Sequence, residues 1–306
     1  MNSLPLVYHP NYSCAFPVNH RFVMSKFVRL YDYCCDQGFV SDRNLFTPGV
    51  VSKEVMARVH DKDYLDMICD QQLDPRAWRR IGLPWSQGLV DRTFTAPNGT
   101  LLAARLALKY GMASHLAGGT HHAHHDFGSG FCLLNDLAFT AKTLIECEEV
   151  NSVLVFDLDV HQGDGTAAML SNEPHAFTCS IHCEKNFPFR KSDSDLDIGL
   201  EKHTSDHDYL EIVESTLQSL LDQQAPDIVL YDAGVDVWVD DGLGHLDISS
   251  SGIRQRDELV LKACLSRGIP VATVIGGGYD KDHARLARRH AVVIETAAEL
   301  FSSHLL

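Results

Sequence analysis

Short apolar runs rich in β-branched residues alternate with longer amphipathic stretches along this chain, and this alternation constrains the fold more than any other feature. The short runs are continuously apolar, which is typical of strands buried on both faces. We expect strands at 5–8, 152–158, 176–181, 227–232 and 270–275. We expect helices at 21–36, 53–58, 98–115, 136–147, 207–222 and 251–267. The pattern predicts an α/β protein with a central, mostly parallel sheet flanked by helices on both faces.

The 306 residues contain no repeat, low-complexity tract or linker that would divide the chain. Since α/β folds of this length often form one unit, we expect a single domain over residues 1–306. The nine cysteines form no CxxC pair and lie in apolar segments, as buried thiols do in a reducing compartment. The start lacks a secretory pattern, and no apolar run approaches the roughly 20 residues of a membrane span. The chain is therefore predicted to be cytoplasmic.

The 41 acidic and 26 basic residues give a formal net charge of −15. This balance disfavours direct binding to nucleic acid, because phosphates need basic patches. Long-range steering by such a charge would favour a cationic substrate, although acidic balance is also common among cytoplasmic proteins. We expect neither nucleic acid nor a membrane as a partner, and the oligomeric state stays open.

Polar residues that can do chemistry follow three of the expected strands. Asp157, Asp159 and His161 follow the second strand, Asp236 follows the fourth and Tyr279 follows the fifth. Ligands of open α/β sheets bind outside the carboxyl ends of the strands. These side chains are therefore expected to meet at one edge of the sheet.

The segment DLDVHQGDG (157–165) places two aspartates and a histidine at a spacing of two. Alternate side chains of an extended segment share a face, so Asp157, Asp159 and His161 can converge. Such a cluster is costly to bury unless a positive charge lies beside it. The alternative to a cation site is a hydrogen-bonded or salt-bridged loop. Two carboxylates and one imidazole, with an open position for water, describe a catalytic rather than a structural zinc site.

The segment GGTHHAHH (118–125) places four histidines within five positions. Imidazole changes its charge near neutral pH, so such a run suits metal binding or proton transfer. A histidine-rich loop at the surface is the alternative.

Together these motifs resemble the histone deacetylase superfamily, the zinc amidohydrolases of the arginase/deacetylase fold. The matching segments occur in family order over most of the chain: HDKDYL (60–65), GGTHHA, GFCLLND, DLDVHQGDG, SIH, DAGVD and GGGY (276–279). Gln162 and the segment DGLGHLDIS look closer to the class IV-like branch, with its many bacterial members, than to class I enzymes.

The resemblance implies one zinc ion per chain with three protein ligands: Asp159, His161 and Asp236. It implies that His121 and His122 are tandem catalytic histidines, oriented by the carboxylates of Asp157 and Asp164 respectively. It also implies that Tyr279 binds the polarised carbonyl. The expected activity is hydrolysis of the amide of an N-acyl, typically acetyl, lysine side chain.

The resemblance further implies an acyl-lysine tunnel formed by four residues: Gly130, Phe131, Phe187 and Leu243. It implies a potassium ion bound near the zinc loop by five residues: Asp157, Asp159, His161, Ser180 and Ile181. His124 and His125 have no counterpart in the family motif, so we expect them on the surface of a loop.

Three other functions compete with this interpretation. An arginase-like hydrolase needs a second metal, whose extra aspartates would fall at Gly163 and Gly234. An inactive binding module would be expected to lack Tyr279, a zinc ligand or a catalytic histidine. An acetylpolyamine or other small-molecule amidohydrolase is the alternative within the enzyme class, although this compact chain shows no obvious rim insertion. The expected partner is thus an acylated protein lysine or an acylated small amine.

Overall fold

The computed structural model describes residues 3–304, and its centre is an eight-stranded sheet in the order β2-β1-β3-β8-β7-β4-β5-β6. Every strand pairing in it is parallel. The strands are β1 (Leu6–Val7), β2 (Leu45–Phe46), β3 (Met112–His115), β4 (Val153–Asp157), β5 (Ala176–Cys183), β6 (Leu196–Leu200), β7 (Ile228–Asp232) and β8 (Val271–Val274). All five expected strands are present, and the sheet confirms the predicted α/β architecture.

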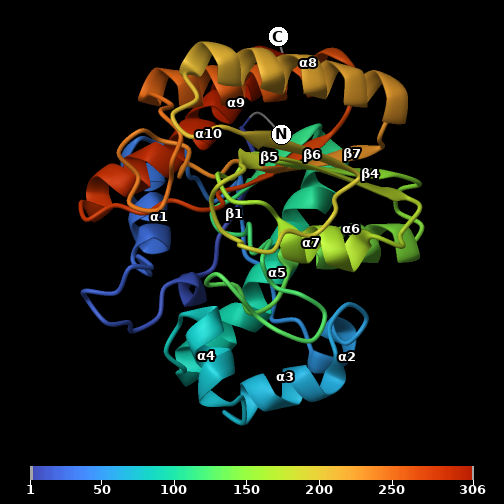
Figure 1. Cartoon of the computed structure of the whole chain (residues 1–306). Coiled ribbons are helices and arrows are strands. Elements are labelled where there is room, and N and C mark those ends of the chain that lie inside the picture. Colours follow the sequence, from blue (N-terminus) through green and yellow to red (C-terminus); the bar gives the residue numbers. More distant parts are fainter. Residues whose placement is uncertain (1–2, 305–306) are drawn as a thin grey trace.

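Helices cover both faces of the sheet (Figure 1). In that view α8, α9 and α10 form a layer above the sheet, and α5, α6 and α7 lie below it. The helices are η1 (Pro10–Tyr12), α1 (Lys26–Asp36), α2 (Lys53–Met56), α3 (Lys62–Cys69), α4 (Pro75–Ile81), α5 (Gln87–Tyr110), α6 (Asp136–Glu146), α7 (Asp164–Leu170), α8 (Asp206–Gln224), α9 (Ser250–Ser266) and α10 (His283–His304). Within the described residues, no helix is long and apolar enough to cross a membrane.

The helix expected at 98–115 is shifted towards the N-terminus in the structure. Helix α5 begins after Ser86, whose side chain accepts a hydrogen bond from Leu89 N at 3.1 Å, and it continues through Pro97. It ends at Gly111, which adopts the positive φ of 89° that favours glycine. The last residues of the expected helix instead form β3, between β1 and β8. Because these residues pair within a buried sheet, tertiary contacts outweigh their helical periodicity.

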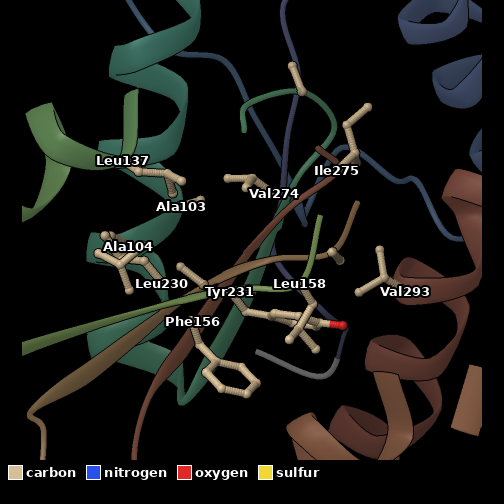
Figure 2. Close-up of a cluster of buried hydrophobic side chains, with 14 of the residues drawn as sticks. Ala103, Ala104, Leu137, Phe156, Leu158, Leu230, Tyr231, Val274, Ile275 and Val293 are labelled. Atoms are coloured by element: carbon tan, nitrogen blue, oxygen red, sulfur yellow. The ribbon is translucent and has the colours of Figure 1, made fainter. Parts of the chain in front are cut away.

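The sheet core is built from alternate faces of its central strands (Figure 2). Phe156 of β4 and Tyr231 of β7 are fully buried and oppose each other in the parallel register. To the left of them in Figure 2, Ala103 and Ala104 of α5 present small side chains, which allow the helix to approach the sheet closely. This packing fixes the strands whose carboxyl ends carry the polar residues.

The central strands end side by side. Asp157, the last residue of β4, lies in register with Asp232 of β7 and Ser180 of β5. Asp232 in turn is in register with Val274 of β8. The loops that follow these strands therefore meet at one edge, as the sequence predicted.

Candidate active site

Three potential metal ligands converge in a fully buried corner at this edge. Nδ1 of His161 lies 3.0 Å from Oδ1 of Asp159 and 3.2 Å from Oδ2 of Asp236. Asp159, His161 and Asp236 are 1 %, 5 % and 0 % exposed respectively. Backbone N–H groups hold the carboxylates, because Gly277 N donates to Asp159 Oδ2 at 2.6 Å and Val160 N donates to Asp236 Oδ1 at 3.0 Å.

This corner is suited to a cation. Burial opposes the charged form of His161, yet the two carboxylates outweigh it and raise the pKa of the imidazole to about 10. Among the described residues, Asp236 Oδ2 receives no well-aligned hydrogen bond. A buried carboxylate oxygen without a hydrogen bond is costly unless a positive charge lies beside it. Two carboxylate oxygens and one imidazole nitrogen therefore form a donor set that can hold a metal ion.

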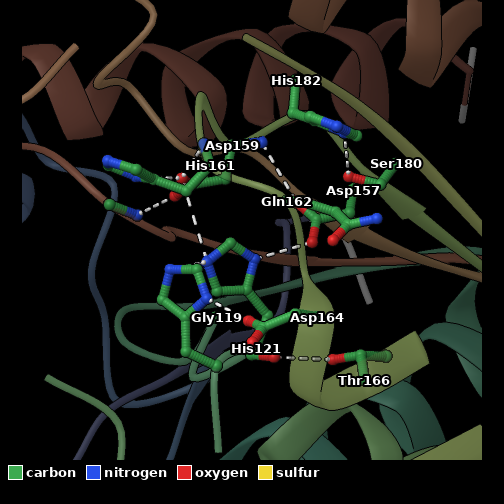
Figure 3. A network of polar contacts seen from close by, with 12 residues as sticks. Gly119, His121, Asp157, Asp159, His161, Gln162, Asp164, Thr166, Ser180 and His182 are labelled. Carbon is green, nitrogen blue, oxygen red and sulfur yellow. Dashed lines mark hydrogen bonds and ion pairs between the residues drawn. The ribbon is translucent and has the colours of Figure 1, made fainter. Parts of the chain in front are cut away.

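The tandem histidines lie beside this corner, each held by a carboxylate. Figure 3 shows His121 together with Asp157 and Asp164. Nδ1 of His121 is 2.7 Å from Asp157 Oδ2, and Nδ1 of His122 is 2.6 Å from Asp164 Oδ1. The Nε2 atoms of the two rings are 3.1 Å apart. Because a carboxylate only accepts, each Nδ1 carries a proton and each Nε2 faces the site.

The two histidines differ in charge. Burial would lower the pKa of His121, but the Asp157 and Asp159 carboxylates raise it well above its usual value. Burial, together with the positive charge of His121, lowers the pKa of His122 to about 3. At neutral pH, His121 is an imidazolium and His122 is a neutral imidazole with Nε2 free to accept a proton.

The structure corrects the expectation for His124. Its side chain is only 15 % exposed, its ring stacks on Phe127, and its Nε2 lies 2.9 Å from Asp164 Oδ2. Each carboxylate oxygen of Asp164 is thus hydrogen-bonded to a histidine, one to His122 and the other to His124. Burial opposes its ionisation, but these hydrogen bonds hold the pKa of Asp164 below its usual value. His125 is exposed, as expected for a loop residue.

Asp232 is a buried acidic residue that the sequence reasoning missed. It is 0 % exposed, and neither of its carboxyl oxygens has a hydrogen-bond partner among residues 3–304. With His121 and Asp157 it forms a second group of donors close enough to share an ion. Burial and the Asp157 charge raise the pKa of Asp232 well above its usual value. The His121 imidazolium already supplies positive charge to this second group. The only sequence signal was the first residue of DAGVD, at the end of a strand.

No room exists for the extra aspartates of a two-metal centre of the arginase type. A Cβ on Gly163 would lie 2.4 Å from Asp157 Oδ2, and one on Gly234 would lie 2.5 Å from Asp159 Oδ2. The Asp157 carboxylate fills the space beside Gly163, and the Asp159 side chain and Cα fill the space beside Gly234, so a larger residue at either position would clash.

Tyr279 lies across from the histidines, and its backbone is held by a second acidic residue. Asp241 Oδ2 accepts from Tyr279 N at 2.7 Å, while its Oδ1 accepts from Leu243 N at 2.9 Å and Gly244 N at 3.2 Å. Burial, reinforced by the carboxylates of Asp236 and Asp159, raises the pKa of Tyr279 well above its usual value. The phenol therefore keeps its proton and can donate a hydrogen bond.

The four expected tunnel residues line one entrance cavity of about 440 Å³ that leads to His122, His161 and Tyr279. The ring of Phe187 lies edge-on to His122 at 4.8 Å, and Phe131 is 5.8 Å from Tyr279. Gly130 adopts a positive φ of 52°, and a Cβ there would lie 2.5 Å from Cδ2 of His122. The backbone at Gly130 can thus approach the catalytic histidine closely. Leu243 is positioned by Asn186, whose side-chain amide donates to the Leu243 carbonyl at 2.9 Å.

A smaller cavity of about 30 Å³ lies beyond the tandem histidines. It is lined by two buried basic residues, Lys26 and Arg92, together with glycines 118, 119, 276 and 277. Lys26 Nζ donates to the Gly276 carbonyl at 3.0 Å, and burial lowers the pKa of Lys26 to about 8. Neither basic residue was identified from the sequence.

A buried arginine joins the loops that carry the candidate metal ligands. Arg256 of α9 is 0 % exposed and donates to the carbonyls of Gly234 at 2.6 Å and Ala233 at 3.2 Å. It also donates to the Leu158 carbonyl at 3.5 Å and pairs with Asp257 at 2.8 Å. One guanidinium thus connects the end of β4 with the end of β7.

Comparisons with known proteins place this chain among relatives. Residues 20–295 match the histone deacetylase domain. The chain is 46 % identical to an uncharacterized protein of Picosynechococcus sp. over 297 residues, which cover 97 % of this chain and 99 % of the relative. It is 27 % identical to histone deacetylase 2 of Arabidopsis thaliana, over 94 % of this chain and 77 % of that protein. Acetoin utilization protein AcuC of Staphylococcus aureus is 28 % identical over 76 % of this chain and 65 % of its own length.

A structural comparison supports the fold. The crystal structure of the HDA15 HD domain superposes with a TM-score of 0.79 at 17 % sequence identity, covering 99 % of this chain and 88 % of that one.

Proposed function

Because this chain belongs to the histone deacetylase family, we propose that it is a zinc-dependent deacylase that hydrolyses the amide of an N-acyl lysine side chain, with acetyl as the preferred acyl group. The observation that carries the proposal is the convergence of three functional groups at the end of one cavity. These are a three-donor metal corner, two histidines of which one is positive and one neutral, and a protonated tyrosine.

Asp159, His161 and Asp236 would hold the zinc ion, which supplies Lewis-acid polarisation of a carbonyl and a water molecule of lowered pKa. The fit rests on the buried Oδ2 of Asp236, which receives no well-aligned hydrogen bond from the described residues, and on the open side of the corner towards the tunnel. A potassium ion held by Asp157, Asp159, His161, Ser180 and Ile181 stays part of the proposal, supported by the adjacent strand ends that carry these residues.

His122 is proposed to move the protons of the reaction. Its Nδ1–H is committed to Asp164, so Nε2 is the atom that accepts a proton from the attacking water. The same atom then donates a proton to the leaving amine nitrogen. His121, kept positive by Asp157, lies 3.1 Å away and favours the build-up of negative charge on the reacting groups.

Tyr279 is proposed to donate a hydrogen bond to the carbonyl oxygen as that oxygen gains charge. Phe131, Phe187 and Leu243 would hold the apolar stem of the acyl-lysine in the cavity, and Gly130 would accept from the amide N–H of the substrate. The products are a free amine and a carboxylate.

An acetylated polyamine or another acylated small amine is the second candidate substrate. The long-range effect of the −15 net charge favours a cationic ligand of this kind. An inactive binding module is disfavoured, because the chain retains the tyrosine, both histidines and all three candidate metal ligands. A cytoplasmic setting stays part of the proposal, supported by nine cysteines that are all free thiols.

The test is a panel of acetyl-lysine peptides, longer-acyl lysine peptides and acetylpolyamines, assayed with zinc-loaded protein. We expect turnover of the acetyl-lysine peptides, and we expect His122→Ala to abolish it. Turnover of acetylpolyamines alone would replace the proposed substrate, and no turnover of any substrate would refute the proposal.

A further inference from the structure

The mouth of the tunnel has the opposite charge to the chain as a whole. The entrance cavity of about 440 Å³ is lined by Arg21, Arg79, Arg80 and His245, and no aspartate or glutamate of residues 3–304 lines it. The chain nevertheless carries 41 acidic against 26 basic residues. The positive charge at the mouth is therefore a local feature that runs against the composition.

These arginines are free to bind a ligand. Within residues 3–304, none of Arg21, Arg79 and Arg80 forms an ion pair with a carboxylate, and all three are exposed. Some other surface arginines are paired, such as Arg254 with Glu299 and Arg267 with Asp222. A ligand at the mouth would not have to displace a carboxylate of the protein.

The helix that carries two of these arginines is fixed to the tunnel wall. Gly130 N donates to the Arg80 carbonyl at 3.3 Å, and Phe131 N donates to the Ile81 carbonyl at 2.7 Å. The Arg80 guanidinium stacks on Phe127 at 4.1 Å, and its Nε donates to the Gly128 carbonyl at 3.0 Å. The terminal nitrogens of Arg80 make no hydrogen bond to the described residues, so they are held in place and still available.

We propose that the tunnel mouth is an anion subsite that selects acyl-lysine substrates carrying a carboxylate next to the acylated side chain. This inference rests on the proposed deacylase function. When the acyl amide lies beside Tyr279, the backbone of an acyl-lysine lies at the mouth, one extended side chain away. The carboxylate can belong to an acidic neighbour in a peptide or to the α-carboxylate of a free acyl-lysine. The positive charge of the arginines at the mouth would repel a polyamine.

The position of Arg79 and Arg80 in the last turn of α4 also suits the helix dipole. That explanation does not cover Arg21, which comes from the segment before α1 and faces the same cavity. If the helix dipole were the whole explanation, replacing the arginines would change stability alone. An anion subsite predicts that replacing them changes substrate choice.

The experiment compares three acetyl-lysine peptides of equal length whose flanking residues are Glu, Ala or Lys. Free Nε-acetyl-lysine and its amide form a second pair that isolates the α-carboxylate. One exposed charge pair changes affinity by up to about fivefold. Two such pairs therefore predict a kcat/KM for the Glu peptide roughly 10-fold or more above that for the Lys peptide, and added salt should reduce the ratio.

The double variant Arg21→Gln/Arg79→Gln should lose most of this preference and keep its rate on the Ala peptide. Arg76→Gln is the matched control, because Arg76 is an exposed arginine of the same helix that does not line the cavity. Fluorescence anisotropy of labelled peptides measures the same preference without turnover.

Hydrolysis of the Ala peptide with equal rates on the Glu and Lys peptides would overturn the anion subsite and leave the proposed function intact. A preference that survives in the double variant would also overturn it. If no peptide is hydrolysed or bound, both the function and the subsite are wrong.

Discussion

Replacing Arg256 by Met should weaken the whole site from a distance, because this residue holds the loops of the candidate metal ligands together. The substitution removes the donors to the Gly234 and Ala233 carbonyls and leaves Asp257 buried without its cation. Tyr231 Oη still donates to Asp257 Oδ1 at 2.6 Å. Breaking a buried ion pair from one side costs about 3–5 kcal/mol. For a chain of this size that corresponds to a fall in Tm of roughly 5–8 °C.

The loss should also depend on pH in a defined direction. Burial already raises the pKa of Asp257, with Arg256 opposing the shift, so removing the arginine raises it further. The unfolded chain then loses its proton near pH 4 while the folded variant keeps it. At Asp257 the folded state binds more protons, so the contribution of this residue to the variant's free energy of unfolding falls as pH rises above about 4.

The assay is urea denaturation of metal-free protein at pH 5 and pH 8, which separates folding from metal binding. Arg254→Met is the control, because Arg254 is on the same helix and its exposed pair with Glu299 should contribute at most about 1 kcal/mol. The reasoning is refuted if Arg256→Met and Arg254→Met unfold with the same free energy, or if the stability that Arg256→Met loses relative to wild type is smaller at pH 8 than at pH 5.

Three further predictions concern catalysis. Tyr279→Phe should lower kcat by roughly 10²–10³ with little change in KM, because the phenol donates mainly to the charged transition state; steady-state kinetics showing an unchanged rate would remove that role. His122→Ala should abolish turnover with metal content intact. In the wild type, kcat/KM should stay level to well below pH 6.5, because burial and His121 lower the pKa of His122 to about 3. A fall in kcat/KM near pH 6.5 would contradict the assignment of His122 as neutral. Asp241→Asn should lower kcat about 10-fold at unchanged metal content, because an amide cannot accept from all three N–H groups that Asp241 holds; loss of metal in elemental analysis would instead make Asp241 part of the metal corner.

The strands β4, β5, β7 and β8 and the residues at their ends could be predicted because both are encoded locally, whereas β3 was predicted as the end of a helix. Runs such as 152–158 are apolar throughout, and parallel strands necessarily bring Asp159 and Asp236 to one edge. Edge strands β2 and β6 lack that signal. β2 is two residues long, and β6 (LDIGL) reads as a polar segment.

The supporting residues could not be predicted, because their roles depend on contacts between distant segments. Arg256 looks like a solvated helix residue until α9 packs against the ends of β4 and β7. His124 was assigned to the surface because only the fold brings it to the second oxygen of Asp164. Asp241 and Lys26 likewise act on glycine-rich loops far away in the sequence.

The most direct test of the account is turnover of an acetyl-lysine peptide during stepwise addition of zinc to metal-free protein. We predict no turnover without metal, a rate that rises linearly with added zinc, and a plateau at one zinc per chain. The reason is that one corner offers three ligands and that Gly163 and Gly234 exclude further carboxylates. Full turnover by the metal-free protein, or a plateau reached only at two zinc ions per chain, would contradict it.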